Sequence, residues 1–314
     1  MSATHPPLIR PADAAAVAEA ASRLRAGLLV AIPTETVYGL AARADRAEAV
    51  AAIYRAKGRP DFNPLIVHVA SLEQAEALAL FDERARLLAR HFWPGPLTMV
   101  LPLREGAGIA PAVTAGLPTV ALRMPAHPTM RAVLAETGLP LAAPSANRSG
   151  GVSPTEARHV AQSLGAAAGL VLDGGACAQG LESTIVALRA DGTWQLLRPG
   201  PIEEARLAAL LGPPRAVMAA RVEAPGQLAS HYAPGKPVRL GARAAKADEF
   251  LIGFGPVAGQ CSLSESGDLA EAAARLYACL HAAAAAPQPR VAVAPVPDEG
   301  IGAAINDRLR RAAA

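Results

Sequence analysis

The chain contains 314 residues, a length that suits about two domains. Hydrophobic residues make up 52% of it and charged residues 18%, a balance that excludes general disorder and allows a sizeable core. Aromatic residues contribute only 4%, so this core must consist mainly of alanine, leucine and valine. The formal net charge of +3 is compatible with a phosphate-bearing ligand but is too small to demonstrate one.

The three cysteines, Cys177, Cys261 and Cys279, are odd in number and widely spaced. They form no C-x-x-C pair and no zinc-like cluster with histidine, so we expect no disulfide scaffold and a reducing, cytoplasmic location. The apolar N-terminal region is interrupted by Asp13 and Glu19, which argues against an export signal or a membrane span. We therefore expect no membrane association.

Strand and helix signals alternate through the first two thirds of the chain. A helix is expected from Pro11, a first-turn residue, to Gly27, which would end it. The residues after position 32 are interpreted as a turn and the start of a helix rich in small residues. Ser153 and Pro154 are expected to cap and open a later helix. The other expected elements are strands at 28–32, 65–69, 97–103 and 120–123 and within 139–151, 169–175, 183–188 and 194–200, and helices at 47–56, 73–80, 82–91 and 128–137.

A stretch rich in proline, glycine and alanine divides the chain. We expect a catalytic domain at 1–211, a linker or lid at 212–237, and a small C-terminal α/β domain at 238–314. In the last of these, strands are expected at 238–240, 250–254 and 291–293 around a helix at 268–284. Some neighbouring strands of the first part resemble hairpins, so the fold class is α/β with a mixed sheet covered by helices.

The stretch "KGRPDFNPLIVHV" concentrates Lys57, Arg59, Asn63 and His68 around two prolines. Arginine offers a planar fork and lysine a compact charge, so this cluster indicates an anion pocket. The alternative is a solvated helix end, where cations favour the negative end of the helix dipole.

Hydroxyl and amide groups gather in two other places. Thr36 lies in "PTETVYGL", either in a turn with a capping box or in a lip of hydroxyls that orients a small ligand. Ser145, Asn147 and Ser153 lie in "PSANRSGGVSPT", whose backbone amides could hold phosphate or could form an ordinary loop. The G-x-x-x-x-G-K pattern of a Walker loop is absent.

Two arginines follow or lie within apolar strands. Arg123 in "VALRMP" and Arg198 in "LLRPGPI" need partners because burying an unpaired charge is expensive, so each is either a structural ion pair or a ligand clamp. Ser183 opens the strand "STIV". Together with the cations and hydroxyls above, these residues describe a site that favours phosphoanhydride or nucleotidyl chemistry by positioning and electrostatics.

Seven motifs occur in one order: "PTETVYGL", "KGRPxxNPL", "WPGPLT", "LRMP", "PSANxSGxxSPT", "STIV" and "RPGPI". In this order they resemble the threonylcarbamoyl-AMP synthase family of the YrdC-like superfamily, over roughly residues 10 to 205. The later "HYAPG" and the extra α/β unit resemble the long, two-domain form of that family. The resemblance implies a YrdC-like α/β twist around a mixed sheet, with a small Rossmann-like C-terminal domain.

The resemblance also implies a reaction. The family joins L-threonine, bicarbonate or CO2 and ATP into threonylcarbamoyl-AMP and pyrophosphate, and a tRNA-modifying threonylcarbamoyl-transfer complex accepts the product. Mg²⁺ would arrive on the ATP phosphates, so no side-chain metal ligand is assigned. A weak RNA contact is a further expectation.

Site residues carry over position by position. Lys57, Arg59, Ser145 and Asn147 match the family's catalytic K-x-R and S-x-N pairs. The positions implied for ATP are Arg59, Asn63, Thr119, Ser145, Ser153, Arg198 and Tyr232, and those implied for threonine are Thr36, His68, Arg123, Ala143 and Ser183.

Two other functions compete with this interpretation. A double-stranded RNA or ribosome-associated binding module would need the cations but not a threonine clamp, and it would favour aromatic stacking platforms, which are scarce here. A hydrogenase-maturation carbamoyltransferase would carry zinc-finger-like and acylphosphatase-like regions, and we identify neither in this sequence.

Overall fold

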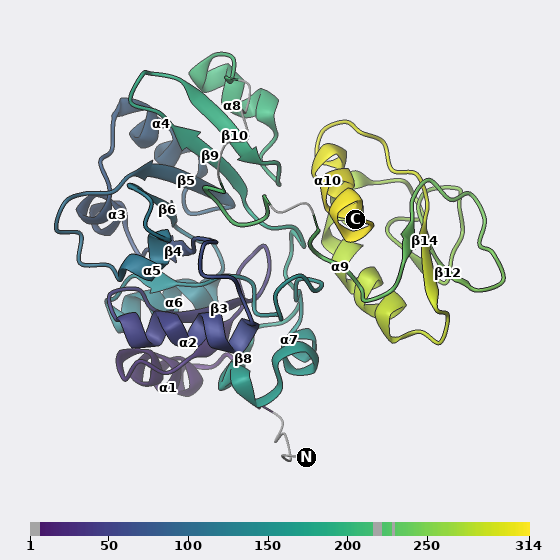
Figure 1. Cartoon of the computed structure of the whole chain (residues 1–314), viewed down its shortest axis with the longest axis horizontal. Coiled ribbons are helices and arrows are strands. Elements are labelled where there is room, and N and C mark those ends of the chain that lie inside the picture. Colours follow the sequence, from purple (N-terminus) through teal and green to yellow (C-terminus); the bar gives the residue numbers. More distant parts are fainter. Residues whose placement is uncertain (1–6, 216–221, 228–229) are drawn as a thin grey trace.

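Two sheets organise the molecule (Figure 1). The computed structural model describes residues 7–215, 222–227 and 230–314. A ten-stranded mixed sheet runs in the order β1-β8-β2-β3-β7-β4-β6-β5-β9-β10, and a four-stranded parallel sheet runs β11-β14-β12-β13. The expected mixed sheet and the small C-terminal α/β unit are therefore confirmed.

The strands of both sheets are short. They are β1 (Leu8–Pro11), β2 (Val30–Ile32), β3 (Gly39–Arg43), β4 (Ile66–His68), β5 (Leu97–Pro102), β6 (Thr119–Arg123), β7 (Leu141–Ala142), β8 (Leu170–Asp173), β9 (Thr184–Leu188), β10 (Trp194–Arg198), β11 (Val238–Arg239), β12 (Glu249–Gly253), β13 (Cys261–Ser262) and β14 (Arg290–Val293). The helices are α1 (Ala14–Arg25), α2 (Ala47–Lys57), α3 (Leu72–Leu78), α4 (Glu83–Phe92), α5 (Pro111–Thr114), α6 (Pro128–Thr137), α7 (Ala157–Leu164), the 3₁₀ turn η1 (Gly165–Ala168), α8 (Glu204–Leu211), α9 (Leu269–Ala285) and α10 (Gly302–Ala312).

Helices cover both faces of the large sheet. Leu24 of α1 and Met130 of α6 share a buried cluster with Ile32 of β2. The opposite face packs against α2, α4, α7 and α8, where the core is built largely from alanine, leucine and valine as the composition predicts. The third core cluster fills the C-terminal unit and includes Val37 and Leu181 of the first part, so the two parts share apolar contacts.

Three local predictions are wrong. The residues after position 32 begin with a turn as expected, but Gly39–Arg43 then form β3, paired antiparallel with β2, in place of a helix, because Gly39–Ala42 are all buried between strands. Ser153 does not cap a helix: α7 begins at Ala157, and the Ser153 hydroxyl instead donates to a carboxylate. Pro11 ends β1, and the side chain of Asp13 caps α1 by accepting from the Ala16 amide.

The expectation of no disulfide scaffold needs a correction, because one disulfide is present. Cys261 in β13 and Cys279 in α9 form a disulfide with their Cα atoms 5.9 Å apart, while Cys177 is free and buried. Sequence spacing could not reveal this pair, because the packing of α9 against β13 brings the two residues together.

We retain the division at 1–211, 212–237 and 238–314 as a proposal. Within the linker, 216–221 and 228–229 lie outside the described residues. The described remainder is fastened on both sides: the Ala233 amide donates to the Gly150 carbonyl, and the His231 amide donates to the Arg311 carbonyl. No helix among the described residues is long and apolar enough to cross a membrane.

Candidate active site

Most of the predicted site residues line one pocket. It lies at the ends of β4, β6, β9 and β10 and beneath the linker, and about 540 Å³ of atom-free space surrounds its side chains, including the part open to solvent. The predicted residues that line it are Thr36, Arg59, His68, Arg123, Ala143, Ser145, Ser183, Arg198 and Tyr232.

Lys57 lies just behind the pocket and supports one of its walls. Its ammonium group donates to the carbonyl oxygens of Ser145 at 2.6 Å and Asn147 at 2.5 Å, and the residue is only 3% exposed. Burial, helped by the neighbouring Arg59 charge, lowers the Lys57 pKa well below its ordinary value. The solvated helix end is therefore excluded, and Lys57 fixes the loop that follows β7.

Arg59 does line the pocket. Its guanidinium donates to the carbonyls of Asn63 at 3.2 Å and Pro64 at 3.0 Å, which hold the fork in place. Burial lowers its pKa to about 10, so the group is still a cation at neutral pH. Because its protein partners are neutral carbonyls, its charge is available to an anionic ligand.

Four further predicted residues lie outside the pocket lining. Asn63 is buried with its Oδ1 unpartnered, and the Asn147 amide donates to the carbonyls of the same loop. Thr119 is half-buried at the start of β6, and the hydroxyl of Ser153 is engaged by Glu182.

Arg123 combines both roles that its sequence context allowed. One guanidinium nitrogen lies 2.7 Å from a carboxylate oxygen of Glu35, out of line for a hydrogen bond, so the structural ion pair exists. A second nitrogen donates to the Thr36 hydroxyl at 2.9 Å. Burial is the largest single influence and opposes ionisation of Glu35, but the Arg123 charge and the N–H donors close to the carboxylate together lower the Glu35 pKa. Arg123 is thus a cation in the pocket wall that is held in place by Glu35, which carries the opposite charge, and by Thr36.

His68 provides a neutral imidazole beside Arg123. The two residues are direct partners in the β4–β6 ladder, and the Nδ1 atom of His68 has no hydrogen-bond partner in the described part of the chain. Burial, with the Arg123 charge adding to it, lowers the His68 pKa to about 3. The ring can therefore donate or accept a hydrogen bond to a ligand without carrying charge.

The Ser183 hydroxyl contacts both a threonine and an arginine. Its hydroxyl hydrogen-bonds the Thr98 hydroxyl at 2.7 Å and accepts from Arg198 at 3.1 Å. Arg198 also donates to the Ser183 and Pro225 carbonyls, all neutral acceptors. Like Arg59, Arg198 is therefore a buried guanidinium that lines the pocket and donates no hydrogen bond to a carboxylate among the described residues.

Four described residues of the linker form part of the pocket wall. Pro225, Gly226, His231 and Tyr232 all line it, and Tyr232 is 1% exposed. The Tyr232 ring lies 5.6 Å from that of Tyr277 in α9, so it also packs the junction with the C-terminal unit. Tyr232 of "HYAPG" therefore both lines the pocket and packs against the C-terminal unit.

Sequence reasoning missed Glu182 and Arg308. Glu182 lines the pocket and directly precedes the quoted "STIV", where a carboxylate before a buried strand was a usable signal. Arg308 carried no such signal, because it meets Glu182 across 126 positions of sequence. Glu182 already accepts from three donors, and the described residues contain no group of three or more His, Cys, Asp or Glu side chains that could hold a metal ion.

Two family models match the chain. The model described as telomere recombination (Sua5_yciO_yrdC) matches residues 22–200, and the model of the threonylcarbamoyl-AMP synthase C-terminal domain (Sua5_C) matches residues 202–314. Threonylcarbamoyl-AMP synthases from Bacillus subtilis and Pyrococcus abyssi are each 47% identical, over 71% and 70% of this chain. Each match spans 66% of the relative's own length.

A solved structure resembles almost the whole chain. The crystal structure of P. abyssi Sua5 complexed with L-threonine has a TM-score of 0.88 and 35% identity, and covers 98% of this chain and 96% of its own. The fold and both family models agree, so the chain belongs to the Sua5/YciO/YrdC family and carries the C-terminal domain of its threonylcarbamoyl-AMP synthases.

Proposed function

We propose that the protein joins L-threonine, bicarbonate or CO2 and ATP into threonylcarbamoyl-AMP and pyrophosphate. The observation that carries this proposal is the meeting of two kinds of residue in one pocket. Around Thr36 and His68 the lining offers hydroxyl groups, a neutral imidazole and the paired cation Arg123, and Arg59 and Arg198 form a cationic side of the same pocket. Ser183 contacts the cationic side directly.

The threonine subsite consists of Thr36, His68, Arg123, Ala143 and Ser183. Arg123 and Thr36 suit the amino-acid carboxylate and hydroxyl, while neutral His68 adds a hydrogen bond without repelling the substrate's amine. Ala143 would act through shape or its backbone. The crystal structure of the P. abyssi relative in complex with L-threonine supports this choice of amino acid.

The nucleotide subsite consists of Arg59, Asn63, Thr119, Ser145, Ser153, Arg198 and Tyr232. Arg59 and Arg198 would stabilise the triphosphate, and the Lys57-supported loop with Ser145 and Asn147 would line its path. Lys57 and Asn147 would act by holding this loop, because their polar atoms bond to its carbonyls.

The chemistry balances without a protein nucleophile. The threonine amine adds to CO2, or to bicarbonate with loss of water, and gives a carbamate. A carbamate oxygen then attacks the α-phosphorus of ATP, the bond from that phosphorus to the bridging oxygen breaks, and pyrophosphate leaves. Arg59 and Arg198 would stabilise the charge that develops on the phosphates, and the linker would keep water from the product.

Magnesium would enter with ATP. In the described residues the pocket's carboxylate, Glu182, has its oxygens occupied by three donors, so it is a poor ligand. The donor set therefore suits a metal held by phosphate oxygens and water, which supplies charge neutralisation when bound.

The product's reactive mixed anhydride needs an acceptor. We propose a tRNA-modifying threonylcarbamoyl-transfer complex, in the cytoplasm, with a weak RNA contact at most. The Cys261–Cys279 disulfide is the feature that fits this compartment least well.

An ATP–pyrophosphate assay tests the proposal. We expect pyrophosphate release that requires both L-threonine and bicarbonate, with threonylcarbamoyl-AMP as the co-product. Release without threonine would point to another carbamoyl acceptor, and no release together with tight RNA binding would favour the binding-module alternative.

A further inference from the structure

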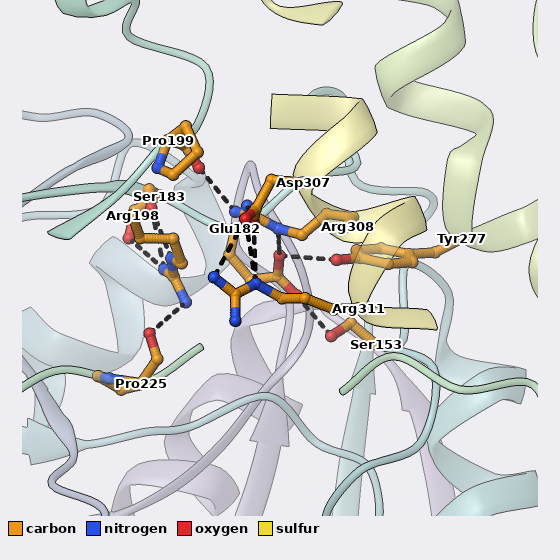
Figure 2. Close-up of polar contacts among 10 residues, drawn as sticks. All are labelled: Ser153, Glu182, Ser183, Arg198, Pro199, Pro225, Tyr277, Asp307, Arg308 and Arg311. Carbon is orange, nitrogen blue, oxygen red and sulfur yellow. Dashed lines mark hydrogen bonds and ion pairs between the residues drawn. The ribbon is translucent and has the colours of Figure 1, made fainter. Parts of the chain in front are cut away.

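A buried carboxylate connects the pocket to the C-terminal unit (Figure 2). Glu182, two residues before the start of β9, is 6% exposed and accepts three hydrogen bonds. Ser153 donates to one oxygen at 2.5 Å, and Tyr277 and Arg308 donate to the other at 2.8 and 3.0 Å. Two of these donors come from α9 and α10, so the C-terminal unit holds a carboxylate of the catalytic pocket.

Arg308 is itself firmly fixed. Asp307 accepts from one of its terminal nitrogens at 2.7 Å, and the Pro199 carbonyl accepts from the other at 2.9 Å. Its guanidinium also lies 5.5 Å from the centre of the Tyr232 ring. The side chain is fully buried, so its position relative to Glu182 is determined by packing as well as charge.

Arg198 is the other cation that acts on Glu182. In the part of the chain that the structure describes, its hydrogen bonds go to Ser183 and Pro225 and none reaches the carboxylate. Burial lowers the Arg198 pKa, and burial opposes ionisation of Glu182, yet Arg308 and then Arg198 lower the Glu182 pKa to about 2. The carboxylate is therefore ionised and is attracted by both arginines.

We propose that Arg308 is a positioning residue that pairs with Glu182 from the C-terminal side and so keeps this carboxylate off Arg198. Arg198 is then left to bind an anionic ligand, which under the proposed function is the ATP phosphate. The inference rests on that function for the identity of the ligand. It gives the C-terminal unit a defined part in nucleotide binding.

The alternative is a purely structural ion pair. Removing one partner of a buried pair is destabilising in any case, so loss of stability or of Vmax cannot separate the two roles. The Michaelis constant for ATP can separate the two roles, because it does not depend on the fraction of folded enzyme. A purely structural role would leave it unchanged.

The test compares three variants with the wild type. In Arg308→Met we expect Glu182 to turn to Arg198 and the ATP KM to rise ~10-fold or more, the scale of losing a hydrogen bond to a charged group. The effect on the threonine KM should be much smaller. In Arg308→Met/Glu182→Gln the competing carboxylate is gone, so the ATP KM should return towards the wild-type value. Arg310→Met removes an equal charge from an exposed position of the same helix and is the control.

Two outcomes would overturn the inference: an unchanged ATP KM in Arg308→Met, or an equal rise in the single and double variants. Calorimetric titration of the four proteins with ATP and Mg²⁺ gives a readout that does not need turnover. If the wild type showed no threonine-dependent pyrophosphate release, the proposed function would fail, while the titrations would still decide whether Arg308 frees an anion site.

Discussion

Two arginines, one in α2 and one in the loop after it, lie four positions apart and differ in their exposure to solvent. Arg55 is exposed on the helix, while Arg59 is 8% exposed and held by the Asn63 and Pro64 carbonyls in the pocket wall. A buried guanidinium whose partners are neutral has lost water without gaining a counter-charge. Such a site is stabilised when an anion binds.

Arg59→Met should therefore raise the ATP KM by ~10- to 100-fold, which corresponds to losing one charge-assisted contact to phosphate. Arg55→Met removes the same charge from a nearby position and is the control. We expect it to leave the ATP KM close to the wild-type value. Steady-state pyrophosphate release at varied ATP measures both. Equal ATP KM values for the two variants would show that the Arg59 charge is not used by the nucleotide.

At the scale of elements, the sequence predicts most clearly those with strong boundary residues. Helix α6 was expected at 128–137 and has these bounds, because Pro128 opens it and Gly138, at φ 67°, ends it. Strand β1 was missed because it is an edge strand with Leu8 49% and Ile9 42% exposed, and it has no alternating pattern. The stretch "GLAAR" of β3 was misread because its small residues suit a helix as well as a buried strand.

The candidate site follows the same logic. Residues within ordered motifs, such as Arg59 and Ser183, were found because their local chemistry is unusual in an alanine-rich chain. Arg308 could not be found, since its role depends on α10 meeting Glu182 across the junction of two units. Long-range contacts of this kind have no local signature.

Gly226 lies at the point where the linker approaches two pocket residues closely enough to exclude a larger side chain. Gly226 has φ +85°, and a Cβ there would lie 2.8 Å from Cδ of Arg198 and 3.0 Å from the Tyr232 hydroxyl. Gly226→Ala should displace both side chains and raise the ATP KM several-fold. Gly235 has φ +74° with nothing within 4 Å, so Gly235→Ala adds similar backbone strain without the collision. If both alanine variants had the same ATP KM, the close approach of Gly226 would have no bearing on the nucleotide site.

At the scale of the whole molecule, the two units meet through rings and apolar residues as well as through Glu182. His159 of α7 stacks on His281 of α9 with ring centres 3.8 Å apart, and Nε2 of His281 lies 3.1 Å from the Ser153 carbonyl. Val37 and Leu181 add to the shared apolar cluster. Burial lowers the pKa of His159 to about 3 and also lowers that of His281, so the stack is formed by neutral rings.

Buried neutral histidines make the stability of the molecule depend on pH. His68 is 3% exposed, its folded pKa of about 3 is far below the ordinary 6.5, and the charges facing it are Arg123 and Glu35. The unfolded chain therefore binds the proton first as the pH falls. The stabilising contribution of this neutral ring is present above pH 6.5 and is lost progressively as the pH falls towards the folded value.

Between pH 6.5 and 5.0 we expect His68 alone to account for a loss of roughly 1.5–2 kcal/mol in the free energy of unfolding. Urea unfolding of the wild type and of His68→Asn at the two pH values measures this, and the variant should lose less by that amount, whatever its stability at pH 6.5. The lowered pKa values of Glu35 and Glu182 act only near and below 4.5, outside this window. His91→Asn, at an exposed position of α4, is the matched control and should keep the wild-type dependence. Parallel declines in the wild type and His68→Asn would mean that His68 takes up its proton in the folded protein, and the neutral hydrogen-bonding role assigned to it beside Arg123 would have to be withdrawn.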